Sequence, residues 1–290
     1  MKRYLCLLTL FLHFLQVFAT DFKFLDDFVT ANRLFTADVY RAVIEHASGN
    51  LVICPIAAQI LLGLARFGAR DNTAEELILY IKNSEENTKQ MFIELNKKLY
   101  SNSKFTLAAA NSMFLDNKYV INNEFKGIAY GDFKAGVQNI DFSKTEEAIE
   151  YVNSWVETKT ARKIKNFLSN GQISAETNSL FVNNMYFSAN WSTQFDRKNT
   201  IRKKFYVNSK RTIETDMMTI YSFFNYYDSK KLDAQILQMP FEGDDVSLII
   251  VLPTKKFGLG NLEDRISEIL VPRNFKTVKT EIFIPKFTDA

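Results

Sequence analysis

Few side chains in this chain of 290 residues could serve as a nucleophile, an imidazole base or a transition-metal ligand. There are two cysteines, Cys6 and Cys54, and two histidines, His13 and His46. Cys54 and His46 together could supply the thiolate and the base of a cysteine protease. Cys54, however, lies in an apolar run directly before Pro55, where no neighbouring charge would lower the pKa of its thiol. We therefore interpret Cys54 as a buried, inert thiol.

The familiar catalytic motifs are missing from the sequence. There is no HExxH, no GxxxxGK[ST] phosphate-binding loop and no GxSxG. Gly258 and Gly260 form a GxG that lacks the third glycine of a dinucleotide site. Asp244 and Asp245 are a single short acidic pair, which is more typical of a solvated turn than of a calcium site. We expect no enzyme activity, no catalytic or metal-binding residue, and no cofactor.

The charges are nearly balanced, with 36 Lys and Arg against 33 Asp and Glu and a formal net charge of +3. The chain is 47% hydrophobic and 24% charged, which is typical of a folded globular protein rather than of a disordered one. This balance favours no nucleic-acid partner. Basic residues gather at positions 162–165 and 202–204, which we interpret as solvated faces.

The first nineteen residues have the three-part pattern of a secretory signal peptide. Lys2 and Arg3 form a positively charged start, and residues 5–12 are almost wholly apolar. Val17 and Ala19 supply small residues before a cleavage point. We predict cleavage after Ala19 and therefore a secreted, extracellular protein. Cleavage would remove two positive charges and lower the formal net charge from +3 to +1.

A membrane anchor is the alternative interpretation of this segment. The apolar run is interrupted by His13 and Gln16, and it is shorter than the roughly 20 apolar residues that a spanning helix needs. No later segment is long and apolar enough to replace it, so no membrane partner is expected. After cleavage the chain would keep Cys54 alone and could form no internal disulfide, so its stability must come from its core.

Helical and strand-like patterns divide the rest of the chain. Apolar residues at three- and four-residue spacing predict helices over 26–47, 56–67, 86–100, 143–157 and 261–270, and a further helix from Thr73. Short apolar or alternating runs predict strands over 51–53, 105–115, 180–189, 201–207, 215–227, 232–239, 246–252 and 280–287. Thr73 with Glu76 and Ser143 with Glu146 have capping-box spacing. Helices dominate the first half and strands the second, which indicates one α+β domain.

Several stretches, in order along the chain, carry a recognisable pattern. They are 50–57 (NLVICPIA), 68–77 (GARDNTAEEL), 109–114, 152–164, 181–191 (FVNNMYFSANW), 237–253 and 284–287 (IPKF). Together they resemble the serpin family over the whole chain after the signal. The resemblance implies a multi-sheet α+β domain and, for most members, suicide inhibition of serine or cysteine proteases. In that mechanism the protease cleaves an exposed reactive loop, which then inserts into the main sheet as a new strand.

The sequence ends at Ala290, before segments that the resemblance would place next: a helix, a central strand, the hinge, the reactive loop and the final core strands. We therefore expect residues 1–19 to be a signal peptide and residues 20–290 a serpin-like domain that lacks its reactive centre. The chain is predicted not to be inhibitory as written, with serine proteases as partners of a longer form. An incomplete inhibitor, a degenerate relative, and a form completed by a partner are the open explanations. A non-inhibitory binding or carrier protein is the alternative function.

The resemblance also implies structural roles for single residues. The family's hydrogen-bonded shutter, which controls strand separation, is matched by Asn50, Cys54, Pro55, Ala57 and Asn183. Cys54 and Ala57 stand where the family pattern has serine. We interpret them as residues that repack an apolar site.

Two further features follow from the resemblance. Trp191 matches a tryptophan at the top of the central sheet. It lies in Asn190-Trp191-Ser192, the one Asn-x-Ser/Thr sequence after the signal, so Asn190 is a candidate for N-glycosylation that burial of Trp191 would restrict. Lys97 and Lys98 lie near a region that binds glycosaminoglycans in some serpins, which implies weak glycosaminoglycan binding, whereas nearby glutamates favour a solvated face.

Overall fold

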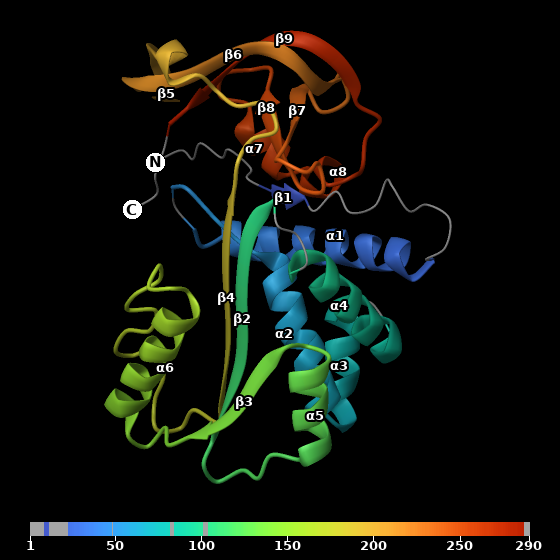
Figure 1. Cartoon of the computed structure of the whole chain (residues 1–290), viewed down its shortest axis with the longest axis vertical. Helices are drawn as coiled ribbons and strands as arrows, with labels where there is room; N and C mark the ends of the chain where they lie inside the picture. The colour runs from blue at the N-terminus through green and yellow to red at the C-terminus, as the bar shows by residue number, and fades with distance from the viewer. Residues whose placement is uncertain (1–8, 12–22, 48, 82–83, 101–103, 287–290) are drawn as a thin grey trace. The chain divides into compact units, whose positions relative to one another are not determined.

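The computed structural model describes residues 9–11, 23–47, 49–81, 84–100 and 104–286 (Figure 1). By their contacts the described residues divide into two compact units. The helical unit lies within residues 22–35 and 54–188, and the strand-rich unit lies within residues 1–21, 36–53 and 189–290. Helix α1 (Lys23–Ile44) contributes residues to both units.

The helical unit contains most of the helices and one sheet. Its helices are α2 (Pro55–Gly68), α3 (Asp71–Ile81), α4 (Glu85–Tyr100), α5 (Asn123–Gly131) and α6 (Thr145–Lys159). Its strands are β2 (Phe105–Asp116), β3 (Ala135–Ile140) and β4 (Ser179–Ala189), in the order β3-β2-β4. Strands β2 and β3 are parallel, with Asn111 opposite Ala135 and Asp116 opposite Ile140.

Helices cover both faces of this sheet. Buried side chains on its strands therefore belong to two different cores, one on each face. Ala135 and Val137 of β3 belong to a core formed with α2, α4 and α5. Phe114 and Ile140 point to the other face, where they pack with α6. Figure 1 shows α6 and the pair α2 and α5 on opposite sides of these strands. The layers therefore hold β2, the central strand, between two sets of helices.

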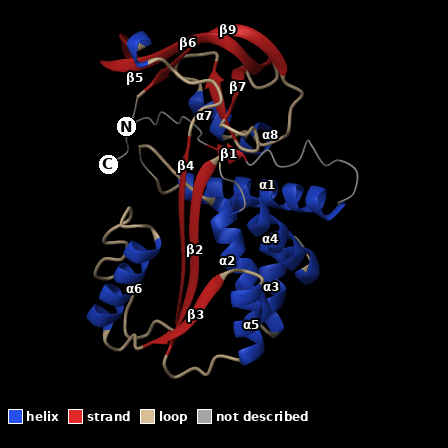
Figure 2. Cartoon of the chain, in the orientation of Figure 1, coloured by secondary structure: helices blue, strands red, loops and turns tan. Residues whose placement is uncertain are grey.

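The strand-rich unit is built around a larger sheet (Figure 2). Its strands are β1 (Thr9–Phe11), β5 (Ile201–Asn208), β6 (Arg211–Ser229), β7 (Ala234–Pro240), β8 (Ser247–Pro253) and β9 (Lys276–Pro285). The order is β1-β8-β7-β6-β5, and β9 pairs with β6. The short helices are η1 (Arg197–Asn199), α7 (Leu259–Glu263) and α8 (Ile266–Ile269). The core of this unit joins β7, β8, α7 and α8 to the second half of α1.

The α+β class predicted from the sequence is confirmed, with differences in single elements. Residues 51–53 form no strand, and Val52 is 75% exposed. The chain instead turns into α2, where Pro55 occupies the first helical turn, a position that its fixed φ suits. Residues 261–270 are two short helices, α7 and α8, rather than one.

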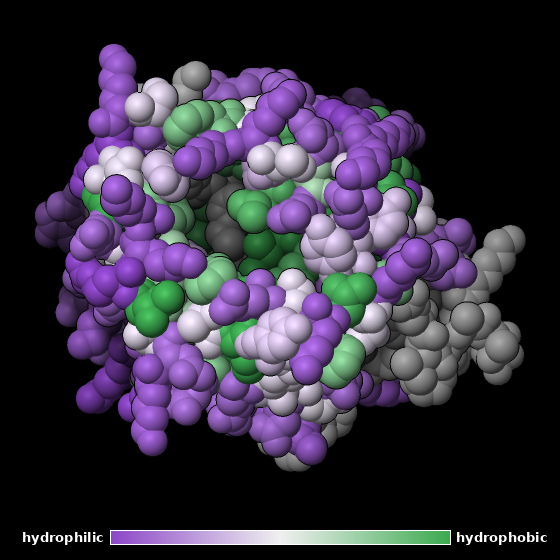
Figure 3. All heavy atoms as spheres, turned by 90° about the horizontal axis from the view of Figure 1, so that it is seen from above, coloured by the Kyte–Doolittle hydropathy of each residue, from purple (hydrophilic) through white to green (hydrophobic). Residues whose placement is uncertain are grey.

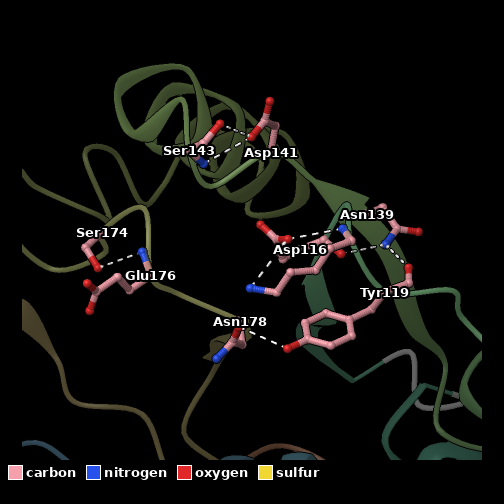
Figure 4. A network of polar contacts seen from close by, with 9 residues as sticks. Asp116, Tyr119, Asn139, Asp141, Ser143, Ser174, Glu176 and Asn178 are labelled. Atoms are coloured by element: carbon pink, nitrogen blue, oxygen red, sulfur yellow. Dashed lines mark hydrogen bonds and ion pairs between the residues drawn. The ribbon is translucent and has the colours of Figure 1, made fainter.

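Neither predicted capping box forms. Helix α3 begins at Asp71, so Thr73 lies inside it. Helix α6 begins at Thr145 without a side-chain cap, because its N-cap residue is Lys144, whose side chain cannot accept a hydrogen bond. The Ser143 backbone N–H and hydroxyl both donate to Oδ1 of Asp141 (Figure 4). The hydrogen bonds from Ser143 lower the pKa of the Asp141 carboxyl.

Candidate functional site

The start of α2 carries three of the residues that match the shutter. Cys54 is the N-cap residue, and its carbonyl accepts from the backbone N–H of Ala57 at 3.1 Å. Its side chain makes no capping bond, and Pro55 has no N–H that needs one. Ala57 is buried, with 7% of its surface exposed. An apolar residue at 57 is therefore compatible with its surroundings, as the sequence interpretation proposed.

The prediction that Cys54 is buried is wrong, because the residue is exposed. Its place at the end of a helix, outside the first turn, opens one side of the residue to solvent. Protein atoms still surround part of the sulfur, and this burial raises the pKa of the thiol, while the nearby backbone N–H of Ala57 acts in the opposite direction. Since exposure of the residue decides whether a reagent reaches it, Cys54 is an accessible thiol that stays protonated at neutral pH.

Strand β4 supplies the side-chain partner of Cys54. The Cys54 Sγ lies 3.7 Å from Sδ of Met185, so the thiol meets a thioether rather than an imidazole. His46, the residue that a thiol protease would need, is exposed in the strand-rich unit. The contact between Cys54 and Met185 places the start of α2 beside β4.

Asn183 lies two residues before Met185 and so faces the same side of β4. Its side-chain amide donates to Oδ1 of Asn111 on β2. Asn111 is 5% exposed, which makes this a cross-strand hydrogen bond at a largely dry position. Asn111 lies in one of the matched motifs, but the sequence analysis assigns it no role. The signal that could have indicated one is the presence of a single amide side chain within an otherwise apolar strand.

Asn50, the remaining shutter match, is exposed and belongs to the strand-rich unit. The structure therefore brings Cys54, Pro55 and Ala57 next to the β4 strand that carries Asn183. A shutter function for these residues stays a prediction.

The longest connection among the described residues, 160–178 between α6 and β4, is tied to the helical unit. The Asn153 side chain on α6 donates to the carbonyl of Leu168 at 2.9 Å and accepts from the Leu168 N–H at 2.7 Å. Leu168 and Ile173 are buried in the core beneath α6. The Thr160 hydroxyl donates to the Val156 carbonyl at 2.8 Å. This connection is a packed part of the unit.

A polar network holds the end of the same connection (Figure 4). The Tyr119 hydroxyl donates to Oδ1 of Asn178 at 3.1 Å, and the backbone N–H of Asp116 donates to the Asn178 carbonyl at 3.0 Å. The Asn139 amide donates to the carbonyls of Asp116 and Tyr119 at 3.1 and 2.9 Å. Glu176 is tied by its backbone N–H to the Ser174 hydroxyl. The network fixes the entry to β4 against β2 and β3.

Asn190 and Trp191 come directly after β4 in the chain and belong to the strand-rich unit. Trp191 forms an antiparallel bridge with Phe241, and the two rings stack 4.4 Å apart at 13°. Trp191 is half-buried, whereas Asn190 and Ser192 are exposed. A place for Trp191 at the top of the central sheet stays a prediction.

The charged groups singled out in the sequence lie on the surface. Asp244 and Asp245 are exposed in the turn between β7 and β8, and Asp244 adopts a left-handed φ of 61°. Arg202 pairs with Asp216 at 3.5 Å, and Lys97 pairs with Glu94 at 2.7 Å. Figure 3 shows a mainly hydrophilic face with hydrophobic residues in small groups. Glycosaminoglycan binding near Lys97 stays a prediction.

In the part of the chain that the structure describes, no three histidine, cysteine, aspartate or glutamate residues gather where they could hold a metal ion. Within the same residues, every helix is too short or too polar to span a bilayer.

The chain is similar to a group of known proteins over most of its length. The family model described as Serpin (serine protease inhibitor) matches residues 30–290. Serpin B3 of Homo sapiens is 28% identical over 284 residues, covering 89% of this chain and 72% of the relative. Antichymotrypsin-2 of Bombyx mori is 30% identical over 266 residues, covering 88% of this chain and 70% of the relative.

Solved structures give the same result. The crystal structure of Serpin48 from the insect Tenebrio molitor matches with a TM-score of 0.87 and 32% identity, covering 90% of this chain and 72% of that one. Uncleaved ovalbumin matches with a TM-score of 0.81 at 23% identity, covering 90% of this chain and 73% of that one. The second likeness bears on the fold alone.

Proposed function

Because the chain belongs to the serpin family, whose members are in general serine protease inhibitors, we propose that it is a secreted protein of this class whose described residues form the scaffold without a bait loop. The family and its α+β fold are those predicted from the sequence motifs. Proteases in general are the partners that the family indicates.

The packed connection 160–178 is the observation that carries this proposal. A bait segment must leave the surface, enter a protease active site and, in this family, then move into a sheet. The longest described connection cannot do so without pulling Leu168 and Ile173 out of the core. It would also break both hydrogen bonds between Asn153 and Leu168. The remaining described connections are shorter, so we expect this form of the chain not to trap proteases.

The proposal also excludes a catalytic role. Serpins generally act as suicide inhibitors rather than as enzymes, and the exposed Cys54 contacts Met185 instead of a base. Secretion is proposed from the leader pattern of residues 1–19. If the leader is cleaved after Ala19, N-terminal sequencing of protein secreted by eukaryotic cells will begin at Thr20. A retained Met1 would contradict this part.

The inhibition part is tested by incubating the 290-residue chain with trypsin-like, chymotrypsin-like and elastase-like proteases. We expect no covalent complex that survives SDS, because no described segment can present a scissile bond and then insert. An inhibitory serpin run with the same proteases is the positive control. A stable band at the summed mass of this chain and a protease would overturn the proposal.

A further inference from the structure

We propose that Asn190 is the acceptor of an N-linked glycan, an inference that rests on the proposed secretion. The local backbone is paired with residues 240–242. The Glu242 N–H donates to the Asn190 carbonyl at 2.8 Å, and the Ser192 N–H donates to the Pro240 carbonyl at 3.0 Å. Between them Trp191 forms its bridge with Phe241.

The pairing holds Trp191 against Phe241, and its two neighbours differ from it in exposure. Trp191 is half-buried and stacks on Phe241, whereas Asn190 and Ser192 are exposed. The sequence suggested that burial of Trp191 would restrict glycosylation. In the structure Trp191 packs on Phe241 while Asn190 stays exposed. The segment carries the full Asn-x-Ser requirement with the acceptor on the solvent side.

The Asn190 amide is also chemically suited to modification. Its Nδ2 makes a long hydrogen bond of 3.4 Å to Oε2 of Glu242. A side-chain amide has two N–H groups, and glycosylation replaces only one of them. The remaining N–H can keep the bond to Glu242, so the attached sugar need not break a native contact.

The modification is a group transfer from a lipid-diphosphate-linked oligosaccharide, the donor class of the secretory pathway. A bond forms between Nδ2 of Asn190 and C1 of the first sugar, while the bond from C1 to the diphosphate oxygen breaks. The amide loses one proton, and the lipid diphosphate leaves with the electron pair of the broken bond. No oxidant or reductant is needed.

The residues of the turn beside Asn190 are polar and exposed. Glu242, Asp244 and Asp245 in the adjoining turn are all exposed, and the turn is closed by the Asp244 N–H donating to the Phe241 carbonyl at 3.0 Å. A glycan on Asn190 would lie beside this acidic turn in solvent.

The test uses the full chain produced in eukaryotic cells with a secretory pathway. The tryptic peptide 166–197, which contains Asn190, is analysed before and after treatment of the native protein with an N-glycosidase in isotope-labelled water. We expect a glycan that the enzyme removes from the native protein, leaving labelled aspartate at 190. The glycan should disappear in Asn190→Gln and in Ser192→Ala and persist in Ser192→Thr.

An internal reporter separates a failure of the site from a failure of secretion. Ile201→Thr creates Asn199-Thr200-Thr at an asparagine that is exposed and nine residues downstream. If Asn199 carries a glycan in this variant while Asn190 is unmodified, the proposed site is wrong and secretion stands. If neither is modified, the natural leader has failed and the secretion proposal is wrong.

In that second case, a chain whose residues 1–19 are replaced by the leader of a known secreted protein decides the site. A glycan on Asn190 in this form supports the site, and an unmodified Asn190 beside a modified Asn199 overturns it.

Discussion

Two neighbouring asparagines on β4 experience opposite surroundings. Asn183 and Asn184 point to opposite faces of the strand because side chains alternate. The Asn183 amide donates to Asn111, whereas Nδ2 of Asn184, a residue only 2% exposed, has no hydrogen-bond partner among the described residues. A buried amide N–H without a partner keeps its full cost of desolvation.

We predict that Asn183→Ala lowers the free energy of unfolding by about 1–3 kcal/mol, since it leaves Oδ1 of Asn111 buried without its donor. Asn184→Ala is the matched control: it removes a buried N–H that has no partner, which offsets the cost of the cavity, so stability should change by no more than about 1 kcal/mol. Urea denaturation with equal slopes measures both changes. Equal losses from the two substitutions would show that the hydrogen bond to Asn111 contributes nothing.

Glu268 on α8 is held between two cations. Arg265 and Lys231 each approach its Oε2 at 2.8 Å, and these hydrogen bonds lower its pKa from the ordinary 4.5 to about 2. A carboxyl whose pKa is lower in the folded state than in the unfolded state stabilises the fold at pH values above the unfolded pKa. This stabilisation is lost as the pH falls through the folded pKa.

The stability difference between the wild type and Glu268→Gln should therefore be constant well above pH 4.5, shrink as the pH falls below 4.5, and lose its pH-dependent part as the pH falls through about 2. Thermal unfolding at a series of pH values measures it. In the background of Lys231→Gln, which removes one partner, the difference should be lost at a higher pH. A difference that does not change between pH 5 and pH 2 would contradict the role of the ion pairs.

Single residues near α2 show what the sequence could and could not predict about the site. Ala57 as an apolar, buried residue followed from its neighbours. The exposure of Cys54 could not be predicted, because apolar neighbours in the sequence do not indicate whether a residue at the end of a helix is exposed to solvent. The Asn111 to Asn183 bond joins residues far apart in sequence, and no local pattern encodes such a pair.

Among the elements, α2 packs closely on α4 at Gly63. A Cβ added there would lie 2.8 Å from Cε2 of Phe92 and 3.0 Å from Cγ2 of Thr88. Phe92 is itself wedged against Phe133, with ring centroids 5.1 Å apart, so it has little room to move. The absence of a side chain at 63 is thus what lets the two helices approach.

Gly63→Ala should lower the free energy of unfolding by about 1–3 kcal/mol through overpacking. Gly127→Ala on α5 is the control, since nothing lies within 4 Å of the added Cβ, and there alanine should stabilise the helix by about 0.5–1 kcal/mol. Denaturation midpoints with a common slope give both values. If both substitutions stabilise, the close approach of α2 to Phe92 is wrong.

The elements that the sequence predicted best are those with long apolar patterns, such as α2, β2 and β4. Helix α5 and strand β3 were not predicted. Helix α5 has nine residues, and its clearest signal is Asn122, whose side chain accepts from the Glu124 N–H as an N-cap. Strand β3 contains Gly136 and depends on pairing with β2 rather than on its own sequence.

At the scale of the whole molecule, part of the predicted leader pairs with the edge of the larger sheet. Thr9–Phe11 pairs antiparallel with β8, with Thr9 opposite Ile249 and Phe11 opposite Ser247. The predicted cleavage after Ala19 would remove this strand and leave the outer edge of β8 without β1.

We therefore expect faster amide hydrogen exchange at residues 247–249 in a chain that begins at Thr20 than in the full chain, at those N–H groups that face β1. The N–H groups of β8 that face β7 serve as the internal control, since that pairing runs from Ala234 to Pro240 and does not depend on the leader. Unchanged exchange at 247–249 would show that β1 does not protect this edge.

The family and the α+β class were within reach of the sequence because short motifs recur in order along the chain. The division into two compact units was not, because α1 reads as one continuous amphipathic helix and yet contributes residues to both. Contacts between distant segments decide that division, and periodicity along the chain carries no information about them.

Cleavage of the predicted leader would remove Cys6 and leave Cys54, exposed at the start of α2, as the single sulfhydryl of residues 20–290. A maleimide fluorophore or spin label could then be attached at one known position without any engineered cysteine. Because the raised pKa keeps the sulfhydryl protonated at neutral pH, coupling should proceed faster in mildly alkaline buffer. The label would report on motion of β4 through its neighbour Met185.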